Sequence, residues 1–252
     1  MTAESERRLF QYWMPNLDIP NPPSSLSYAE LADFQNREIL KANGIRLSET
    51  ALLTALEETT NILQAAAAHM IGTLPSLSGE VASVLTKLLS DTNDTVRVEA
   101  AYALARYSVP EGKAALVECL SYPLDAYISP LVAAGYVAQL GDPQGFPVIV
   151  KGLDSNLAAV RSVASKQLYF FASFHGSKDK QGNAIDLVHQ FERALDDPDT
   201  GIQWQALVQL REVALPGVAE FLENYARNAT YRDLRSLAES ILQVHGWTGR
   251  DG

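Results

Sequence analysis

The sequence predicts an all-α fold, an α-solenoid of about six helix pairs with an N-terminal helical extension. The first observation is a motif whose six copies begin at residues 63, 96, 128, 160, 202 and 234, so that successive copies lie 33, 32, 32, 42 and 32 residues apart. The second is an apolar segment that precedes most copies. The third is that no stretch shows the sustained alternation of a β-strand. Repeats of this length stack because one helix pair cannot bury its apolar face alone.

The motif places an aliphatic residue, a small residue and an aliphatic residue four positions apart. It is clearest at Val96, Ala100 and Leu104. These positions share one helical face, and the small middle residue allows a neighbouring helix to approach closely. The same frame recurs, more loosely in the first and third copies, at Leu63, Ile128, Val160, Ile202 and Leu234.

The N-terminal extension, residues 1–47, lies outside the repeat, and residues 48–252 are expected to form the solenoid. Prolines between residues 15 and 23 indicate an irregular stretch. Ser27-Tyr28-Ala29-Glu30 is a capping box, which predicts a helix that ends at Asn43-Gly44. Because a terminal repeat needs cover for its apolar face, we expect this extension to cap the first pair. A separate binding arm is the alternative.

Within each pair, an apolar first helix is joined by a short polar turn to the helix that carries the motif. The first helices are expected at 51–56, 81–89, 114–120, 146–153, 185–195 and 218–225. A turn aspartate precedes the motif arginine in two copies, Asp91 before Arg97 and Asp154 before Arg161. We expect each aspartate to face that arginine.

Two features interrupt this pattern. Gln64, Ser129 and Gln203 replace the arginine in three copies, so a continuous Asp–Arg ladder is not expected. The 42-residue spacing contains about ten extra polar residues, 174–183, which are expected to form a surface loop without a function. A functional loop is the alternative.

Composition narrows the functional classes. The chain is 47% hydrophobic with a formal net charge of −10, which predicts a packed core. The negative charge argues against nucleic-acid binding, since phosphate contacts need clustered Lys and Arg. The acidic opening is not a signal peptide, and no apolar run approaches the roughly 18 residues of a membrane span. We expect a cytoplasmic protein whose single cysteine, Cys119, is a small buried side chain.

Motifs for catalysis or metal binding are missing from the sequence. The four histidines are scattered, and neither a phosphate loop nor a nucleophile elbow is present. We therefore expect no metal, no cofactor and no catalysis by the chain on its own.

The turn aspartate followed by Val-Arg-x-x-Ala-x-x-x-Leu resembles the HEAT repeat, and specifically the repeat of the cyanobacterial phycobilisome lyase family, over about residues 48–246. The resemblance implies a protein-interaction scaffold or chaperone-like subunit. Its partners would be a phycobiliprotein or a lyase partner subunit, and a bilin chromophore is allowed as a ligand. Any enzymatic role would be that of a subunit of a phycocyanobilin lyase. The His-Glu dipeptides of the HEAT-like deoxyhypusine hydroxylases are absent.

The inner face of the solenoid is the predicted binding surface. Offsets of +2, +6, +9 and +13 from each motif start lie opposite the buried positions. They contain the aromatic and cationic residues Tyr102, Lys166, Tyr169, Trp204 and Arg211. Such side chains suit a protein partner, or a planar tetrapyrrole with two propionates. The alternative is that each aromatic packs locally against an adjacent helix.

A second functional hypothesis is a general adaptor without a chromophore role. One version docks an iron–sulfur cluster assembly factor, and another docks a different cytosolic partner. A single cysteine cannot hold a four-thiolate cluster, so any cluster would belong mainly to the partner. A nucleic-acid enzyme of the HEAT-like glycosylase kind is disfavoured, because only Lys166 and Arg211 bring positive charge to the inner face.

Overall fold

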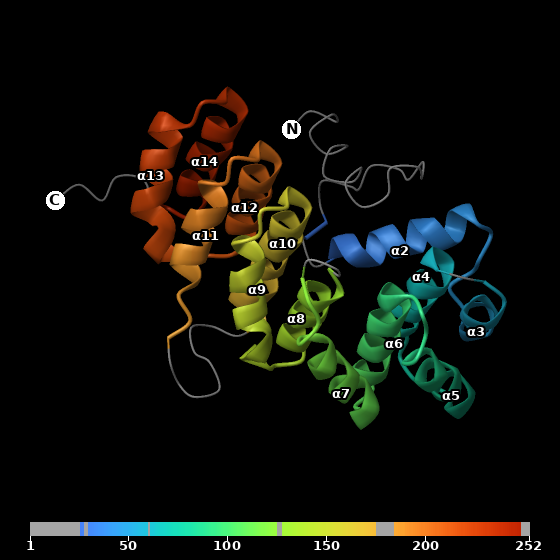
Figure 1. Ribbon diagram of the computed structural model, residues 1–252. Coiled ribbons are helices and arrows are strands. Elements are labelled where there is room, and N and C mark those ends of the chain that lie inside the picture. The colour runs from blue at the N-terminus through green and yellow to red at the C-terminus, as the bar shows by residue number, and fades with distance from the viewer. Residues whose placement is uncertain (1–25, 28–29, 60, 125–127, 175–183, 248–252) are drawn as a thin grey trace.

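The computed structural model describes residues 26–27, 30–59, 61–124, 128–174 and 184–247. These residues form thirteen α-helices and two short 3-10 helices, without a β-strand among them (Figure 1). The predicted all-α class is confirmed. None of the described helices has the length and apolar character needed to cross a bilayer.

Twelve of the helices form the six predicted pairs. The pairs are α3 (Glu49–Glu58) with α4 (Ile62–Ile71), α5 (Gly79–Leu88) with α6 (Asp94–Arg106), α7 (Pro110–Cys119) with α8 (Ser129–Gln139), α9 (Phe146–Leu153) with α10 (Ala158–Phe174), α11 (Leu187–Leu195) with α12 (Thr200–Glu212), and α13 (Ala219–Asn228) with α14 (Arg232–Val244). Short 3-10 helices precede α9 and α13, at Pro143–Gly145 and Pro216–Val218.

The motif residues occupy equivalent places in these pairs, as predicted. Val96, Val160, Ile202 and Leu234 each stand two residues after the start of the second helix of their pair. Leu63 is one residue inside α4, and Ile128 immediately precedes α8. The small residues at +4 are fully buried in five copies, at Ala67, Ala100, Ala164, Ala206 and Ala238.

Helix α2 (Glu30–Ala42) precedes the pairs and has the boundaries that its caps predict. The backbone N–H and the hydroxyl of Ser27 donate to Glu30 Oε2 at 2.8 and 2.6 Å. Gly44 adopts φ +73°, the left-handed conformation that terminates a helix. The buried side chains of α2, Ile39 and Leu40, join the apolar cluster of the first pair. Residues 1–25 lie outside the described residues.

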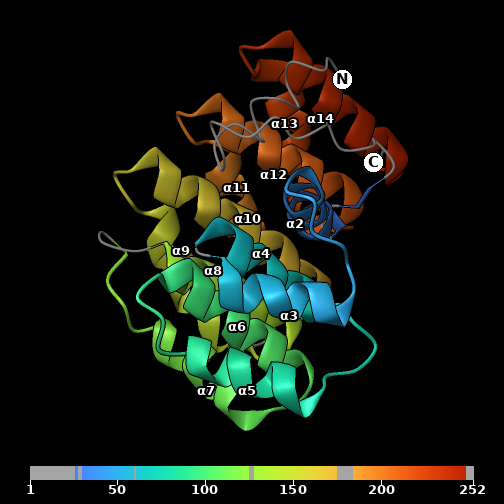
Figure 2. The same cartoon turned by 90° about the vertical axis from the view of Figure 1, so that its right-hand side faces the viewer.

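The second helices form the inner layer of a curved row, and the first helices form the outer layer (Figures 1 and 2). Each second helix packs against the next one, from α4 through α14. Among the outer helices, extended contact is seen in the described residues only between α3 and α5 and between α9 and α11. Helix α2 packs on α4 at the inner side of the row. Successive inner helices contact one another more closely than successive outer helices do, because the inner side of a curved row is shorter than its outer side.

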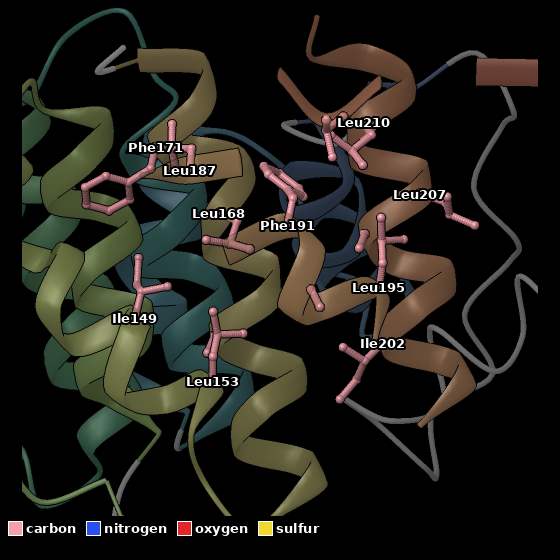
Figure 3. Close-up of a cluster of buried hydrophobic side chains, with 14 of the residues drawn as sticks. Ile149, Leu153, Leu168, Phe171, Leu187, Phe191, Leu195, Ile202, Leu207 and Leu210 are labelled. Atoms are coloured by element: carbon pink, nitrogen blue, oxygen red, sulfur yellow. The ribbon is translucent and has the colours of Figure 1, made fainter. Parts of the chain in front are cut away.

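The core follows from this stacking. Between α9 and α12, apolar side chains from both layers fill the space that the helices enclose (Figure 3). Ile149, Leu168, Phe171, Phe191 and Leu210 are all fully buried there. Burying one such side chain contributes roughly 1.5–3 kcal/mol, and every pair depends on its neighbours for this burial.

The turn ion pairs differ from the expectation. Arg97 donates to the backbone oxygens of Asp91 and Thr92, at 2.7 and 3.1 Å, rather than to a carboxylate. The guanidinium of Arg161 reaches the next pair, where it donates to both carboxylate oxygens of Asp197 at 2.7 and 3.1 Å. The expected pairings within one pair are wrong, because Arg97 and Arg161, which lie on the second helices, donate to backbone oxygens of their own turns, Asp91 O and Ser155 O.

Asp154, the other turn aspartate, pairs with Arg193 on α11 instead of with Arg161. This contact also joins the fourth pair to the fifth. The turn aspartates whose carboxylates form ion pairs, Asp154 and Asp197, therefore link successive pairs. The predicted loop at 174–183 lies, beyond Phe174, outside the described residues.

The close approach at +4 gives a stability prediction. We expect Ala164→Leu to lower the free energy of unfolding by about 1–3 kcal/mol, because Ala164 is fully buried and the added carbons must displace packed neighbours. Ala159→Leu makes the same change at an exposed position of α10 and should be close to neutral. Chemical denaturation of both variants tests this. Equal effects of the two substitutions would contradict the buried role of the +4 alanine.

Candidate functional site

The structure brings four of the five predicted site residues onto two adjacent inner helices. Lys166 and Tyr169 lie on α10, and Trp204 and Arg211 lie on α12, which packs against α10. We call these four residues the α10–α12 patch. The fifth, Tyr102, lies on α6 and is separated from the patch by α8 (Figure 1).

The members of the patch differ in exposure. Lys166, Trp204 and Arg211 are half-buried, whereas Tyr169 is buried and lies edge-on to Phe170, with ring centroids 5.4 Å apart. Trp204 packs against the core, and its buried indole Nε1 has no hydrogen-bond partner among the described residues. An unpaired buried N–H is costly, by roughly 1–3 kcal/mol. Because this atom is buried, the part of Trp204 that a partner can contact is the exposed part of its ring.

A polar seam fixes the geometry beneath the patch. The side-chain amides of Gln205 and Gln209 on α12 donate to the backbone oxygens of Ser162 and Ser165 on α10, at 2.9 and 3.1 Å. Both glutamines are buried. These bonds hold α12 at a fixed register on α10, so the patch has a defined arrangement before any partner binds.

The charge of the patch depends on pH. Burial lowers the pKa of Lys166 to about 7, because a low-dielectric environment disfavours the ammonium form. An anionic group placed beside this side chain would favour the charged form. Binding of a carboxylate here is therefore linked to proton uptake near neutral pH.

Tyr102 is built into a separate network. Its ring stacks on that of Tyr136 of α8, with centroids 3.8 Å apart and an interplanar angle of 9°. Its hydroxyl donates to Gln139 Oε1 at 2.8 Å and accepts from Arg106 at 3.3 Å. Tyr102 is 4% exposed. For Tyr102 the alternative holds: both its ring and its hydroxyl are engaged by residues of the adjacent helix α8.

Behind these two rings lies a buried histidine held between two carboxylates. His69 of α4 donates from Nδ1 to Glu99 Oε2 at 3.0 Å and from Nε2 to Asp33 Oδ1 at 2.9 Å. Glu99 also accepts the hydroxyl of Tyr136, at 2.6 Å. We call Asp33, His69, Glu99 and Tyr136 the His69 clasp. Its members come from α2, α6, α8 and α4, so it joins four helices.

The electrostatics of the clasp keep His69 charged. Burial alone would lower its pKa, but the charge of Glu99 and the hydrogen bonds to Asp33 and Glu99 raise the pKa of His69 to about 9. At Asp33, burial alone would raise the pKa of the carboxyl, but the hydrogen bond to His69 and the charge of His69 outweigh burial and lower that pKa. An imidazolium that donates both N–H groups has no lone pair for a metal or a proton. The clasp is therefore suited to holding helices together.

Sequence reasoning missed most of the clasp. Tyr136 occupies +8 of its copy, where the other five copies have Leu or Ile, and Glu99 is the only acidic residue at +3. These exceptions were visible signals. Asp33 carried none, because it lies outside the repeat.

Metal binding and thiol chemistry find no support in the described residues. They contain no group of three or more His, Cys, Asp or Glu side chains arranged to hold a metal ion. Cys119 is buried, as predicted, and burial raises the pKa of its thiol to about 11.

The clasp predicts a pH-dependent stability. The folded-state pKa of His69 lies above the ordinary 6.5, so its contribution is complete below pH 6.5 and is lost as the pH rises through about 9. We expect the difference in unfolding free energy between the native protein and His69→Gln to shrink by about 1–3 kcal/mol between pH 6 and 9.5. Because Asp33 is partly exposed and its charge is screened by solvent, we expect this decrease to fall in the lower half of the range.

Denaturation at both pH values measures this difference. Burial raises the pKa of Tyr102 and of Tyr136, so their hydroxyls stay protonated throughout. His189→Gln, at an exposed histidine, is the control and should show no such trend. A His69→Gln difference that is constant with pH would exclude a charged His69.

The comparisons with known proteins concern the repeats. The family model of HEAT repeats matches residues 49–134. No curated protein matches the chain. An engineered protein is 22% identical, with 79% of this chain and 96% of that one covered and a TM-score of 0.47.

Two natural structures are also similar. The complex of CpcE and CpcF of phycocyanin lyase from Nostoc sp. PCC7120 is 19% identical, covers 94% of each chain and has a TM-score of 0.47. The archaeal HEAT-like repeats protein from Thermococcus onnurineus NA1 is 16% identical, with 89% of this chain and 99% of that one covered and a TM-score of 0.37. The sequence match identifies HEAT repeats over residues 49–134, and the same packing of helices in pairs continues from there through α14.

Proposed function

We propose that this HEAT-repeat protein is a scaffold that binds a partner protein on its inner face through the α10–α12 patch. The observation that carries the proposal is that Lys166, Trp204 and Arg211 are all half-buried, and so partly exposed, on the adjacent inner helices α10 and α12. Tryptophan and arginine are the residue types most enriched at binding hot spots. Trp204 and Arg211 supply both types on one helix.

The chemistry of the patch favours a partner that presents carboxylates beside an apolar surface. Arg211 offers a guanidinium, which binds carboxylates in a bidentate manner. Lys166 gains its charge most readily next to an anion, because burial lowers its pKa to about 7. The polar seam between α10 and α12 keeps the patch in place, which reduces the ordering cost of binding.

A bilin chromophore is the finer proposal for the same patch. A linear tetrapyrrole has a flat conjugated surface for Trp204 and two propionates for the cations Lys166 and Arg211. In this version the protein partner is a phycobiliprotein or a second lyase subunit, and the chain contributes to bilin attachment as one subunit. The alternative is an adaptor for an iron–sulfur assembly factor or another protein, with no chromophore.

The scaffold proposal predicts which side chains matter for binding. With the purified chain as bait, a partner captured from the native host should bind Trp204→Ala and Arg211→Ala each about thirtyfold more weakly, the loss expected for a hot-spot residue. Arg46→Ala, at an exposed arginine away from the patch, is the control. Affinities are measured by calorimetry with the identified partner, and circular dichroism should show unchanged helix content. Unchanged affinity in both patch variants would refute the inner-face site.

The bilin version has its own test. Titration with phycocyanobilin should quench the tryptophan fluorescence of the native protein, and most of the quenching should vanish in Trp204→Phe because that ring is the proposed contact. Binding with quenching that persists in this variant would place the bilin elsewhere. Absence of binding favours the adaptor version.

Catalysis gives a further prediction. We expect the purified chain alone not to attach phycocyanobilin to an apo-phycobiliprotein, and to do so only when a partner subunit is added. Covalent attachment is measured by the absorbance of the denatured, separated protein. Turnover by the chain alone that a single substitution abolishes would contradict this expectation.

A further inference from the structure

One position of the HEAT repeat has the same structural task in four of the six pairs. The residue directly after the motif start reaches back and donates its side chain to a backbone oxygen at the end of the first helix or in the turn after it. Gln64 donates to Leu56, Arg97 to Asp91, Arg161 to Ser155 and Gln203 to Asp197, at 2.7, 2.7, 2.9 and 2.6 Å. Glutamine thus replaces arginine without loss of the bond.

In two of these four pairs, the following pair bonds to this residue. Arg161 forms its ion pair with Asp197, in the turn of the fifth pair. Gln203 accepts the hydroxyl of Tyr225, on the first helix of the sixth pair, at 2.7 Å. The position therefore faces the following pair.

Arg235 holds this position in the sixth pair, but it bonds neither to a backbone oxygen of its own turn nor to a following pair. Its guanidinium makes no hydrogen bond and no ion pair with the residues that the structure describes, and the same is true of Arg227 and Arg232. Among the described residues no further helix pair follows α14, which lies with α13 at one end of the row (Figure 1).

The three arginines line a hollow of about 730 Å³ between α13 and α14. Glu223, Glu239 and Ser236 also line it, and Ala226 and Leu242 form its apolar floor. Three cations therefore outweigh two carboxylates here, on a chain whose formal net charge is −10. The hollow thus has a net positive lining, which favours an acidic group.

We propose that this hollow is a second interaction surface, which docks an aspartate-bearing turn of an acidic partner protein against Arg235. The docked turn would take the place that the Asp197 turn takes on Arg161, with its carboxylate bound by the guanidinium. Arg227 and Arg232 add positive charge on either side. Glu223 and Glu239 select for a partner that has donor groups flanking its aspartate.

A second copy of this chain fits the hollow poorly. End-to-end stacking of copies would bring the first pair of one molecule against the last pair of another. The turn of the first pair reads Thr59-Thr60-Asn61 and has no carboxylate. The turn aspartates Asp154 and Asp197 are already paired with Arg193 and Arg161. A different protein is therefore the better occupant.

The test uses a synthetic peptide that corresponds to residues 194–203 of this chain, which includes Asp196, Asp197 and Asp199. We expect millimolar peptide to shift the amide NMR signals of α13 and α14 in the isotope-labelled full chain. Arg235→Gln should weaken binding about threefold to fivefold, the loss of one exposed charge pair. The triple variant Arg227→Gln, Arg232→Gln, Arg235→Gln should abolish it.

Three controls make the result specific. Lys87→Gln removes one exposed charge from α5 and should leave the affinity unchanged. A peptide with asparagine at all three aspartates should not bind. Trp204→Ala should bind the acidic peptide normally, so that failure of the inner-face site and failure of this site can be distinguished.

Other outcomes overturn the proposal. They are the absence of shifts in α13 and α14 at millimolar peptide, equal affinity of the triple variant, and equal binding of the asparagine peptide. Self-association of the native chain that the triple variant abolishes would assign the hollow to a second copy instead.

Discussion

The burial of each helix pair against its neighbours is the constraint on which this structure depends. No pair has a complete core of its own, since the apolar side chains of α9 to α12 fill a common space. The buried alanines at +4 set the distance at which successive inner helices meet. One methyl-sized position, repeated in five of six pairs, therefore permits the continuous inner layer on which both the clasp and the patch are built.

Polar bonds across the inner layer give this apolar stacking a unique register. The His69 clasp joins α2, α4, α6 and α8, and glutamine amides join α10 to α12. Apolar contacts alone tolerate sliding, whereas a buried carboxylate or amide is stabilised only when its partner is in place. The inner helices thus differ in exposure: around Tyr102 the ring and the hydroxyl are taken up by neighbouring side chains, whereas Trp204 and Arg211 stay half-buried.

The repeat pattern also indicates where side chains are left available for a binding partner. In the fourth and fifth pairs, the next pair supplies the partner of the residue after the motif start: Asp197 for Arg161 and Tyr225 for Gln203. Arg235 has the same place in its pair without such a neighbour among the described residues. A repeat position whose periodic partner is not found among the described residues can therefore offer a binding surface without any new residue type.

The sequence by itself determined the periodic features. The spacing of the copies, the capping box at Ser27 and the small residues at +4 located the helices, because these signals act within one helix or between adjacent helices. Contacts between distant residues could not be read in this way. The partners of His69 lie 30 and 36 residues away, and the aspartate of Arg161 belongs to the following pair. Only the curvature and stacking of the pairs decide which side chains meet across such separations, so the tertiary structure alone determined that Tyr102 is buried in a network while Trp204 stays half-buried.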